Sequence, residues 1–143
     1  MRPIKFRAWD NREKEYMGGG DKLDLYYSAH MGALMLDNDT YDFDTSVLFE
    51  QFTGLLDKNG VEIYEGDIVK IEETTSDGKE HNYNLAVKFS SGTFNIYNPN
   101  CCKTCESGWG CVSDLCEAIA FSDNRVSVVG NIHENPELLE VKK

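Results

Sequence analysis

The residues with the clearest chemical potential are the cysteines, which lie together in one short segment. All five fall within 16 residues, at Cys101, Cys102, Cys105, Cys111 and Cys116. Structural zinc is held tetrahedrally by four ligands such as thiolates, and a C-x2-C turn is the usual start of such a site. Cys102, Cys105, Cys111 and Cys116 could complete a site of four thiolates, with Cys101 left over. A metal held in this way would fold a segment that has no core of its own.

The spacing of the cysteines also fits two other interpretations. Only one C-x2-C pair is present, the second pair is a less usual C-x4-C, and the link between them is short for paired zinc knuckles. Free thiols are therefore the main alternative to structural zinc, and a disulfide or redox role is the third. A thioredoxin-like site is disfavoured because Cys102-x-x-Cys105 does not lie between a strand and a long helix.

Other candidate motifs lack residues that their chemistry requires. The acidic segment Asp37–Asp44 invites a calcium interpretation, but an EF-hand loop would need Gly at Asp42 and Glu at Leu48. His133 is followed by Glu134, yet no second histidine stands at the H-E-x-x-H spacing. The sequence has no G-x-S-x-G, P-loop or G-x-G-x-x-G run. We therefore predict no catalytic centre and no enzyme.

The charge of the chain limits its partners. Asp and Glu number 25 against 14 Lys and Arg, which gives a formal net charge of −11. Proteins that bind phosphate backbones gain affinity from Lys and Arg contacts, so nucleic-acid binding is disfavoured. Only in the N-terminal stretch around Lys5 and Arg7 do basic residues outnumber acidic ones. The acidic balance favours a basic protein partner, approached by electrostatic steering.

Nothing in the sequence predicts a membrane segment or an export signal. No run of about 18 apolar residues is present, as a spanning helix would require. Met1–Lys5 lacks the apolar region of a secretory signal peptide. We therefore expect a cytoplasmic protein, whose cysteines stay reduced.

The elements that must position these residues are mostly strands. Apolar and polar residues alternate, as in half-buried strands, at Ile4–Ala8, Val69–Ile71, Leu85–Phe89 and Phe94–Ile96. Val126–Ile132 is rich in β-branched residues. Five short antiparallel strands after residue 50 are too few for a sandwich and suit a small closed barrel. We predict an N-terminal β extension at 1–50 and an SH3-like barrel at 51–143, with a Cys-rich insert at 98–116.

Glycine-containing turns separate the predicted strands. Asp57-Lys58-Asn59-Gly60 fits a type I turn with a left-handed last residue. Asp77-Gly78 is a type I′ dipeptide, and Ser91-Gly92 predicts another tight reversal. Glu65-Gly66-Asp67 is explained more simply by a glycine that the backbone requires than by acid–base chemistry.

Helix is predicted mainly near the end of the chain. Asn135 can cap a short C-terminal helix that has Pro136 at its first position. Asp114-x-x-Glu117 could open another helix through Phe121, although a strand over Ala118–Phe121 fits nearly as well. Residues 18–46 are weakly patterned.

Three blocks of the sequence resemble the YopX family, which occurs largely in bacteriophages and prophages. The blocks are Lys5–Asp10, Gln51–Val69 and Val129–Leu139. The resemblance implies an SH3-like barrel, a phage or prophage origin and homo-oligomers. It implies no activity and no catalytic residues. The segment Cys101–Cys116 departs from the common pattern of the family.

We therefore expect a non-enzymatic phage or prophage accessory protein that acts by protein–protein contact in the cytoplasm of a bacterial host. One alternative is a nucleic-acid-associated SH3-like module, and another is a small zinc-stabilised protein with an unknown activity.

Overall fold

The computed structural model describes residues 3–17, 25–28, 33–36, 47–74, 76–98, 112–121 and 125–140. Contacts within the chain divide it into two compact units: an N-terminal unit of Lys5–Gln51, and a C-terminal unit of Phe52–Lys143 together with Met1–Ile4. The division falls within a single strand. The predicted domains, 1–50 and 51–143, remain a prediction as independently folding units.

The N-terminal unit is built on antiparallel strands. Its elements are β1 (Phe6–Asp10), β2 (Glu15–Tyr16), β3 (Leu25–Ser28), β4 (Ala33–Leu36) and the first part of β5 (Val47–Leu56). Strand β1 pairs with both β2 and β5, and β3 pairs with β4. Ala8 and Trp9 of β1 are both buried. Because neighbouring residues of a strand point to opposite faces, β1 is covered on both faces.

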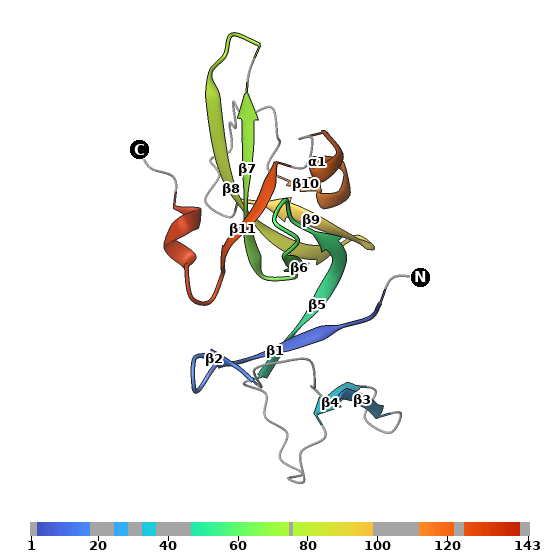
Figure 1. The fold of residues 1–143 in the computed structure, drawn as a ribbon. Helices are drawn as coiled ribbons and strands as arrows, with labels where there is room; N and C mark the ends of the chain where they lie inside the picture. The colour runs from blue at the N-terminus through green and yellow to red at the C-terminus, as the bar shows by residue number, and fades with distance from the viewer. Residues whose placement is uncertain are drawn as a thin grey trace. The chain divides into compact units, whose positions relative to one another are not determined.

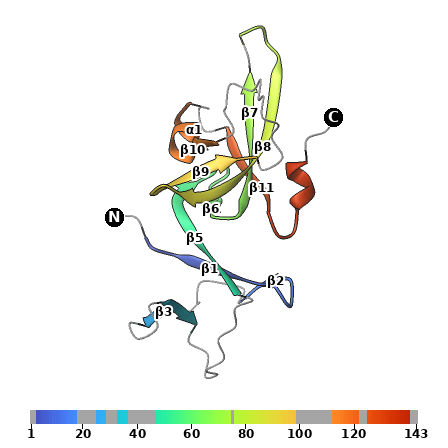
Figure 2. The same cartoon turned by 180° about the vertical axis from the view of Figure 1, so that it is seen from behind.

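The C-terminal unit is built around a five-stranded antiparallel sheet (Figure 1). Its elements are the end of β5, β6 (Glu62–Tyr64), β7 (Asp67–Thr74), β8 (Glu80–Ser90), β9 (Thr93–Tyr97), β10 (Val112–Asp114), α1 (Leu115–Phe121), β11 (Val126–Asn131) and the 3-10 turn η1 (Pro136–Leu139). The strand order in the sheet is β10-β9-β8-β7-β11, while β6 pairs with β5. The last strand thus lies beside the first long strand of its sheet, as both views show (Figures 1 and 2).

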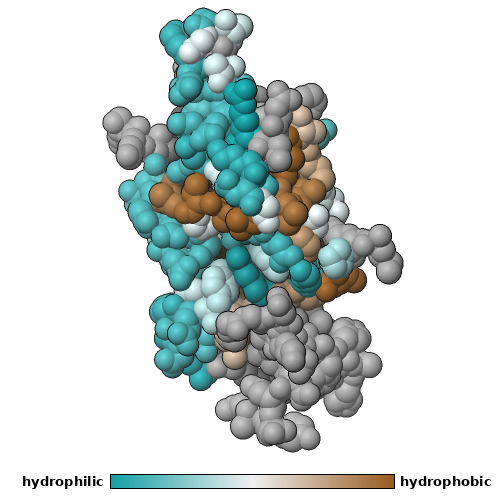
Figure 3. Space-filling model, viewed as in Figure 1, coloured by the Kyte–Doolittle hydropathy of each residue, from teal (hydrophilic) through white to brown (hydrophobic). Residues whose placement is uncertain are grey.

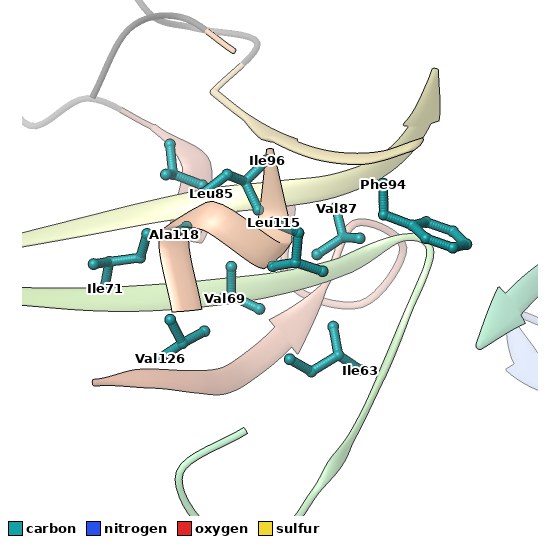
Figure 4. Close-up of a cluster of buried hydrophobic side chains, with 10 residues drawn as sticks. All are labelled: Ile63, Val69, Ile71, Leu85, Val87, Phe94, Ile96, Leu115, Ala118 and Val126. Carbon is teal, nitrogen blue, oxygen red and sulfur yellow. The ribbon is translucent and has the colours of Figure 1, made fainter. Parts of the chain in front are cut away.

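The main core lies on one face of this sheet. Alternate residues of β7 and β8, such as Val69 and Val87, point toward α1, which contributes Leu115 and Ala118 (Figure 4). The buried residues of this cluster are Ile63, Val69, Ile71, Leu85, Val87, Phe94, Ile96, Leu115, Ala118 and Val126. Full burial of such aliphatic side chains contributes roughly 1.5–3 kcal/mol each.

A smaller cluster lies on the opposite face of the sheet. Ile68 and Ala86 are buried there together with Leu139 of η1. The Asn84 side chain fixes the turn by donating its Nδ2 hydrogen to the Leu138 carbonyl at 2.9 Å. The end of the described chain is therefore packed onto the sheet.

The mostly β character and the antiparallel pairing are confirmed, and so are two of the predicted turns. Gly60 has φ +81° and its N–H donates to the Asp57 carbonyl at 3.0 Å. Ser91 and Gly92 both have positive φ, as a type I′ turn requires. The helix alternative at Asp114 is also confirmed, because α1 spans Leu115–Phe121 and leaves no strand there.

Two local predictions were wrong. Asp77-Gly78 is not a two-residue type I′ turn: Thr74 pairs with Glu80, and only Gly78 of the dipeptide has positive φ. Asn135 does not cap a helix with its side chain, and the C-terminal segment is a single 3-10 turn. Its Oδ1 instead accepts a hydrogen bond from the Asn131 N–H. A hydrogen bond from a residue four positions earlier thus replaces the expected cap.

Candidate functional site

The strongest polar cluster of the C-terminal unit is centred on a buried carboxylate at Asp57. Its Oδ1 accepts hydrogen bonds from the N–H groups of Asn59 and Val61, at 2.7 and 2.9 Å. Its Oδ2 accepts one from the Val128 N–H of β11 at 2.9 Å. The neighbouring Lys58 N–H donates to the Val126 carbonyl, also at 2.9 Å. We call this set of contacts the Asp57 lock, because it fastens the β5–β6 turn to the outer edge of β11.

The surroundings of the Asp57 carboxylate favour its ionised form. Burial raises its pKa, but the hydrogen bonds from Val128, Val61 and Asn59 lower it by more, so the pKa lies below its usual value. A carboxylate with its lone pairs occupied by backbone donors is not poised to exchange protons near neutral pH. Its role in the structure is to hold backbone.

The Glu65-Gly66-Asp67 turn is also structural. Gly66 has φ +82°, a conformation that L side chains rarely adopt. Its N–H donates to the Val87 carbonyl and its carbonyl accepts from the Ile132 N–H, each at 2.9 Å. The Asp67 Oδ2 accepts a hydrogen bond from the Tyr64 N–H at 2.7 Å. The turn joins β8 to the end of β11, which agrees with the sequence interpretation of this motif.

The segment after β11 is fixed by Asn131. Its Oδ1 accepts hydrogen bonds from the N–H groups of His133 and Glu134, at 3.0 and 2.9 Å. A Cβ placed on Gly130 would lie 2.5 Å from the Asn135 Oδ1, so the close approach requires glycine. The pairing of β11 with β7 shifts register between Val128 and Gly130, which makes a bulge beside this loop. His133 thus lies at a tight junction that follows the strand.

A third polar cluster lies in the N-terminal unit. The Arg7 Nε is 2.7 Å from the Glu50 Oε2, which also accepts a hydrogen bond from the Tyr16 hydroxyl at 3.0 Å. The Arg7 guanidinium lies 4.6 Å from the centre of the Tyr16 ring, and Trp9 meets that ring edge-on at 5.0 Å. The basic residue of the first sequence block is therefore paired within its own sheet.

The predicted zinc ligands fall mostly outside the described residues. Cys101, Cys102, Cys105 and Cys111 lie there, and so do His30 and the acidic segment Asp37–Asp44. Cys116 is an exposed free thiol on α1. Within the described ranges, no three Cys, His, Asp or Glu side chains gather as a metal would require. Structural zinc, free thiols and a redox role at these cysteines all stay predictions.

The start of the helix that carries Cys116 is well defined. Asp114 Oδ1 accepts hydrogen bonds from the N–H groups of Cys116 and Glu117, at 2.8 and 3.2 Å, as an N-cap does. Its Oδ2 accepts one from the Thr93 hydroxyl at 2.7 Å. The Thr93 hydrogen bond and those from the helix lower the Asp114 pKa in spite of partial burial. Thus Cys116 is held on a helix that is tied to β9.

The surface of the C-terminal unit combines charge with an apolar band. Figure 3 shows hydrophilic residues over the hairpin of β7 and β8, and hydrophobic residues gathered across the face that carries β11. The large apolar residues exposed in this unit include Leu56, Val61, Phe89 and Val129. Beside β11, the Glu72 carboxylate accepts hydrogen bonds from both Lys58 and Lys70, at 2.8 Å each. These bonds lower its pKa to about 2.

Sequence reasoning missed two features of this surface. The contact between Asp57 and Val128 joins residues far apart in the chain, and only a hairpin turn was visible around Asp57. The long hairpin of β7 and β8 was predicted as two short strands. The signal for its length was the polar but uninterrupted run His81–Asn84, which carries no proline or glycine. Among the described residues, no helix is both long and apolar enough to cross a membrane.

These features define a small, mostly β protein with antiparallel sheets, whose motif side chains bond chiefly to its own backbone. The YopX protein family model matches residues 5–140, and the chain therefore belongs to this family. The resemblance drawn from the three sequence blocks is confirmed. No curated protein sequence matches the chain.

Two solved structures are similar over the full length. Protein EF1440 from Enterococcus faecalis is 27% identical, covers 98% of this chain and 100% of its own, and has a TM-score of 0.59. Protein yopX from Bacillus subtilis is 21% identical, covers 100% of both chains, and has a TM-score of 0.56. The second likeness supports the fold alone.

Proposed function

We propose that this chain is a phage or prophage accessory protein that acts by binding another protein in the cytoplasm of a bacterial host, without catalysing a reaction. The single observation behind this proposal is the use of the motif residues. Asp57, Asp67 and Asn131, three polar residues of the second and third sequence blocks, each accept hydrogen bonds from backbone N–H groups. Family residues whose side chains bind the backbone in this way build a scaffold rather than a reaction centre.

The scaffold that we propose is an SH3-like barrel. In such a fold the strands close on themselves, which removes the exposed sheet edges. The Asp57 lock supports this proposal, because it covers the outer edge of β11 with the β5–β6 turn. An experimental structure checks it directly, and an open β11 edge would contradict it.

We further propose that the partner is basic. The net charge of −11 favours such a partner by steering its approach, an effect that salt weakens. Glu137 and Glu140 are exposed acids at the C-terminal turn, and their side chains face solvent. They offer a place to reverse charge without touching the Asp57 lock or the core.

The test is a pull-down from phage-infected host lysate with the tagged protein, at low salt and above physiological salt. A specific partner that is lost at high salt, and lost with Glu137→Lys/Glu140→Lys but kept with Glu137→Gln/Glu140→Gln, supports the proposal. Recovery of no specific partner counts against it. A mobility-shift assay at low salt addresses the nucleic-acid alternative, and elemental analysis of the same sample addresses zinc at the cysteine segment.

A further inference from the structure

The exposed part of the Asp57 lock contains a reactive pair of residues. Asn59-Gly60 is the only place in the sequence where glycine follows asparagine. Both residues are exposed. Gly60 has φ +81°, and a Cβ built on it would meet nothing within 4 Å, so the space beside the peptide bond of this pair is open. Asparagine is a thermolabile residue, and it is most labile where the next residue has no side chain to hinder attack on its amide.

The reaction open to such a pair is the loss of ammonia. The Gly60 backbone nitrogen gives its proton to water or hydroxide and attacks the Asn59 Cγ. A carbon–nitrogen bond forms to give a cyclic succinimide. The bond from Cγ to the side-chain nitrogen breaks, and that nitrogen takes up a proton and leaves as ammonia. No oxidant, reductant or cofactor is needed.

Water then opens the succinimide at one of its two carbonyls. Attack at Cγ breaks the bond from Cγ to the Gly60 nitrogen and leaves aspartate at position 59. Attack at the backbone carbonyl breaks the bond from that carbon to the same nitrogen. The chain then runs through Cβ and Cγ, which is isoaspartate. Each product carries a new carboxylate in place of the amide.

The Asp57 lock holds both of the reacting groups. The Gly60 N–H donates to the Asp57 carbonyl at 3.0 Å. The Asn59 side chain forms a hydrogen bond with the Asp57 carboxylate, to which the Asn59 N–H also donates at 2.7 Å. Attack by the Gly60 nitrogen on the Asn59 Cγ requires the bonds of the Gly60 N–H and of the Asn59 side chain to break. The reaction therefore proceeds from transient openings of the turn, and the frequency of these openings sets its rate.

Either product impairs the Asp57 lock. The N–H groups of Asn59 and Val61 both donate to the Asp57 Oδ1, and isoaspartate inserts an additional backbone atom between them. Aspartate keeps the length of the backbone, but it places a second carboxylate where an amide had bonded the Asp57 carboxylate. Neighbouring like charges repel each other. Because Asp57 also accepts the Val128 N–H, the change reaches the outer edge of β11.

We propose that Asn59 is a site of spontaneous deamidation, through which the protein irreversibly loses the Asp57 lock as it ages. The closed lock slows the reaction, and the product prevents the lock from closing again in its original form. The attachment of the β5–β6 turn to β11 therefore has a limited lifetime. This inference concerns the scaffold and does not depend on the partner proposed above.

The first test follows the modification itself. The purified full chain is incubated at mildly alkaline pH, where the Gly60 nitrogen loses its proton more readily, and its proteolytic peptides are analysed by mass spectrometry over time. We expect the mass increase of an amide-to-carboxylate conversion at Asn59 to appear at least about tenfold faster than at Asn82, an exposed asparagine that tyrosine follows. Equal rates at the two residues would overturn the proposal.

The matched variant for this test is Asn59→Gln. It keeps an amide at the same position, but its longer side chain would have to close a larger and less favourable ring. We expect no mass increase at position 59 over the same period, and an increase as fast as that of wild type would contradict the succinimide route. Isomerisation of Asp77-Gly78 through a similar ring leaves the mass unchanged, so it does not interfere.

The second test measures the consequence for β11. Chains modified at Asn59 carry an additional negative charge, so ion exchange separates them from unmodified chains. We expect their Val128 amide to exchange with deuterium at least about threefold faster, while the Gly66 amide, whose hydrogen bond to Val87 does not involve the turn, keeps its rate. Unchanged exchange at Val128 would overturn the proposal. Equal acceleration of both amides would also overturn it, because the damage would then not be specific to the lock.

Discussion

The outer edge of β11 and the edge of β8 beyond the end of β9 differ in what covers them. On the β11 side, a carboxylate from a distant turn accepts the Val128 N–H, and a bulge interrupts the strand. On the β8 side, no described strand pairs with the outer edge past Ala86, and the pairing of β8 with β7 runs without interruption. The backbone chemistry is the same at both edges. The buried Asp57 side chain and the bulge therefore distinguish the β11 edge from the β8 edge.

The largest effect is expected from opening the covered edge. Asp57→Ala leaves three backbone N–H groups without their acceptor, two of them in the turn and one in β11. Buried donors that lose a charged acceptor are costly, so we expect a loss of about 3 kcal/mol or more in the free energy of unfolding. Urea denaturation measures it. The control is Asp77→Ala at the exposed tip of the β7–β8 hairpin, where we expect a change within about 0.5 kcal/mol. Equal effects of the two variants would contradict the contrast between the edges.

The next largest effect is expected at the end of β11. In Gly130→Ala the new Cβ would lie 2.5 Å from the Asn135 Oδ1 and 2.9 Å from its Cγ. We expect a cost of about 1–3 kcal/mol, because the whole Asn135 side chain must move. The double variant Gly130→Ala/Asn135→Ala should recover part of that loss in the same denaturation experiment. A single variant as stable as wild type would show that the loop adapts freely.

A smaller effect is expected from titrating the Asp57 lock. The Asp57 pKa is lowered in the folded protein, so the unfolded chain takes up the proton first as the pH falls. The stability contributed by this carboxylate is therefore complete above its unfolded pKa of about 4, and it is lost as the pH falls through the folded pKa. Urea midpoints measured between neutral pH and pH about 3 should decline for wild type. They should decline less for Asp57→Asn, and parallel curves for the two proteins would contradict this account.

The smallest effect concerns amide exchange along the edge of β8 beyond the end of β9, and it involves no change in the free energy of unfolding. The amide N–H groups of Glu80 and Asn82 point away from β7, while those of His81 and Tyr83 are bonded to it. The exchange experiment is done at low protein concentration. We expect the first pair to exchange with deuterium at least about tenfold faster than the second. NMR-detected exchange measures this alternation. Uniform rates along residues 80–83 would show that the outer part of the β7–β8 hairpin opens as one unit.

Much of the strand pattern was predictable because it depends on near neighbours in the sequence. The alternation around Val69, Leu85 and Phe94 reflects burial on one face of a sheet, and the core confirms it. Gly60 and Ser91-Gly92 adopt the positive φ angles that their turns require. The family blocks added the kinship of the whole chain, which composition alone could not supply.

The failures have two physical causes. Asp77-Gly78 was interpreted as a two-residue turn from its own composition, but the pairing of Thr74 with Glu80 leaves a longer loop. Asn135 was expected to cap the residues that follow it, but its side chain accepts the Asn131 N–H. The partner of Asp57 lies 71 residues away, and no local pattern marks it. The first two positions were decided by pairings with residues four to six positions apart, which neither the dipeptide nor the cap pattern contains, and only the Asp57 contact depended on a distant residue.

The separation of Asp57 from Val128 along the chain has a kinetic consequence. The hairpins β7–β8 and β8–β9 join neighbours along the chain and can form within microseconds of each other. Strand β11 instead has to return to β7 from the far end of the C-terminal unit, and the turn at Asp57 can engage Val128 only after that return. Long loops close slowly relative to local hairpins, so we expect this engagement to complete the folding reaction. During synthesis on the ribosome, this edge of β7 would stay unpaired until β11 has emerged.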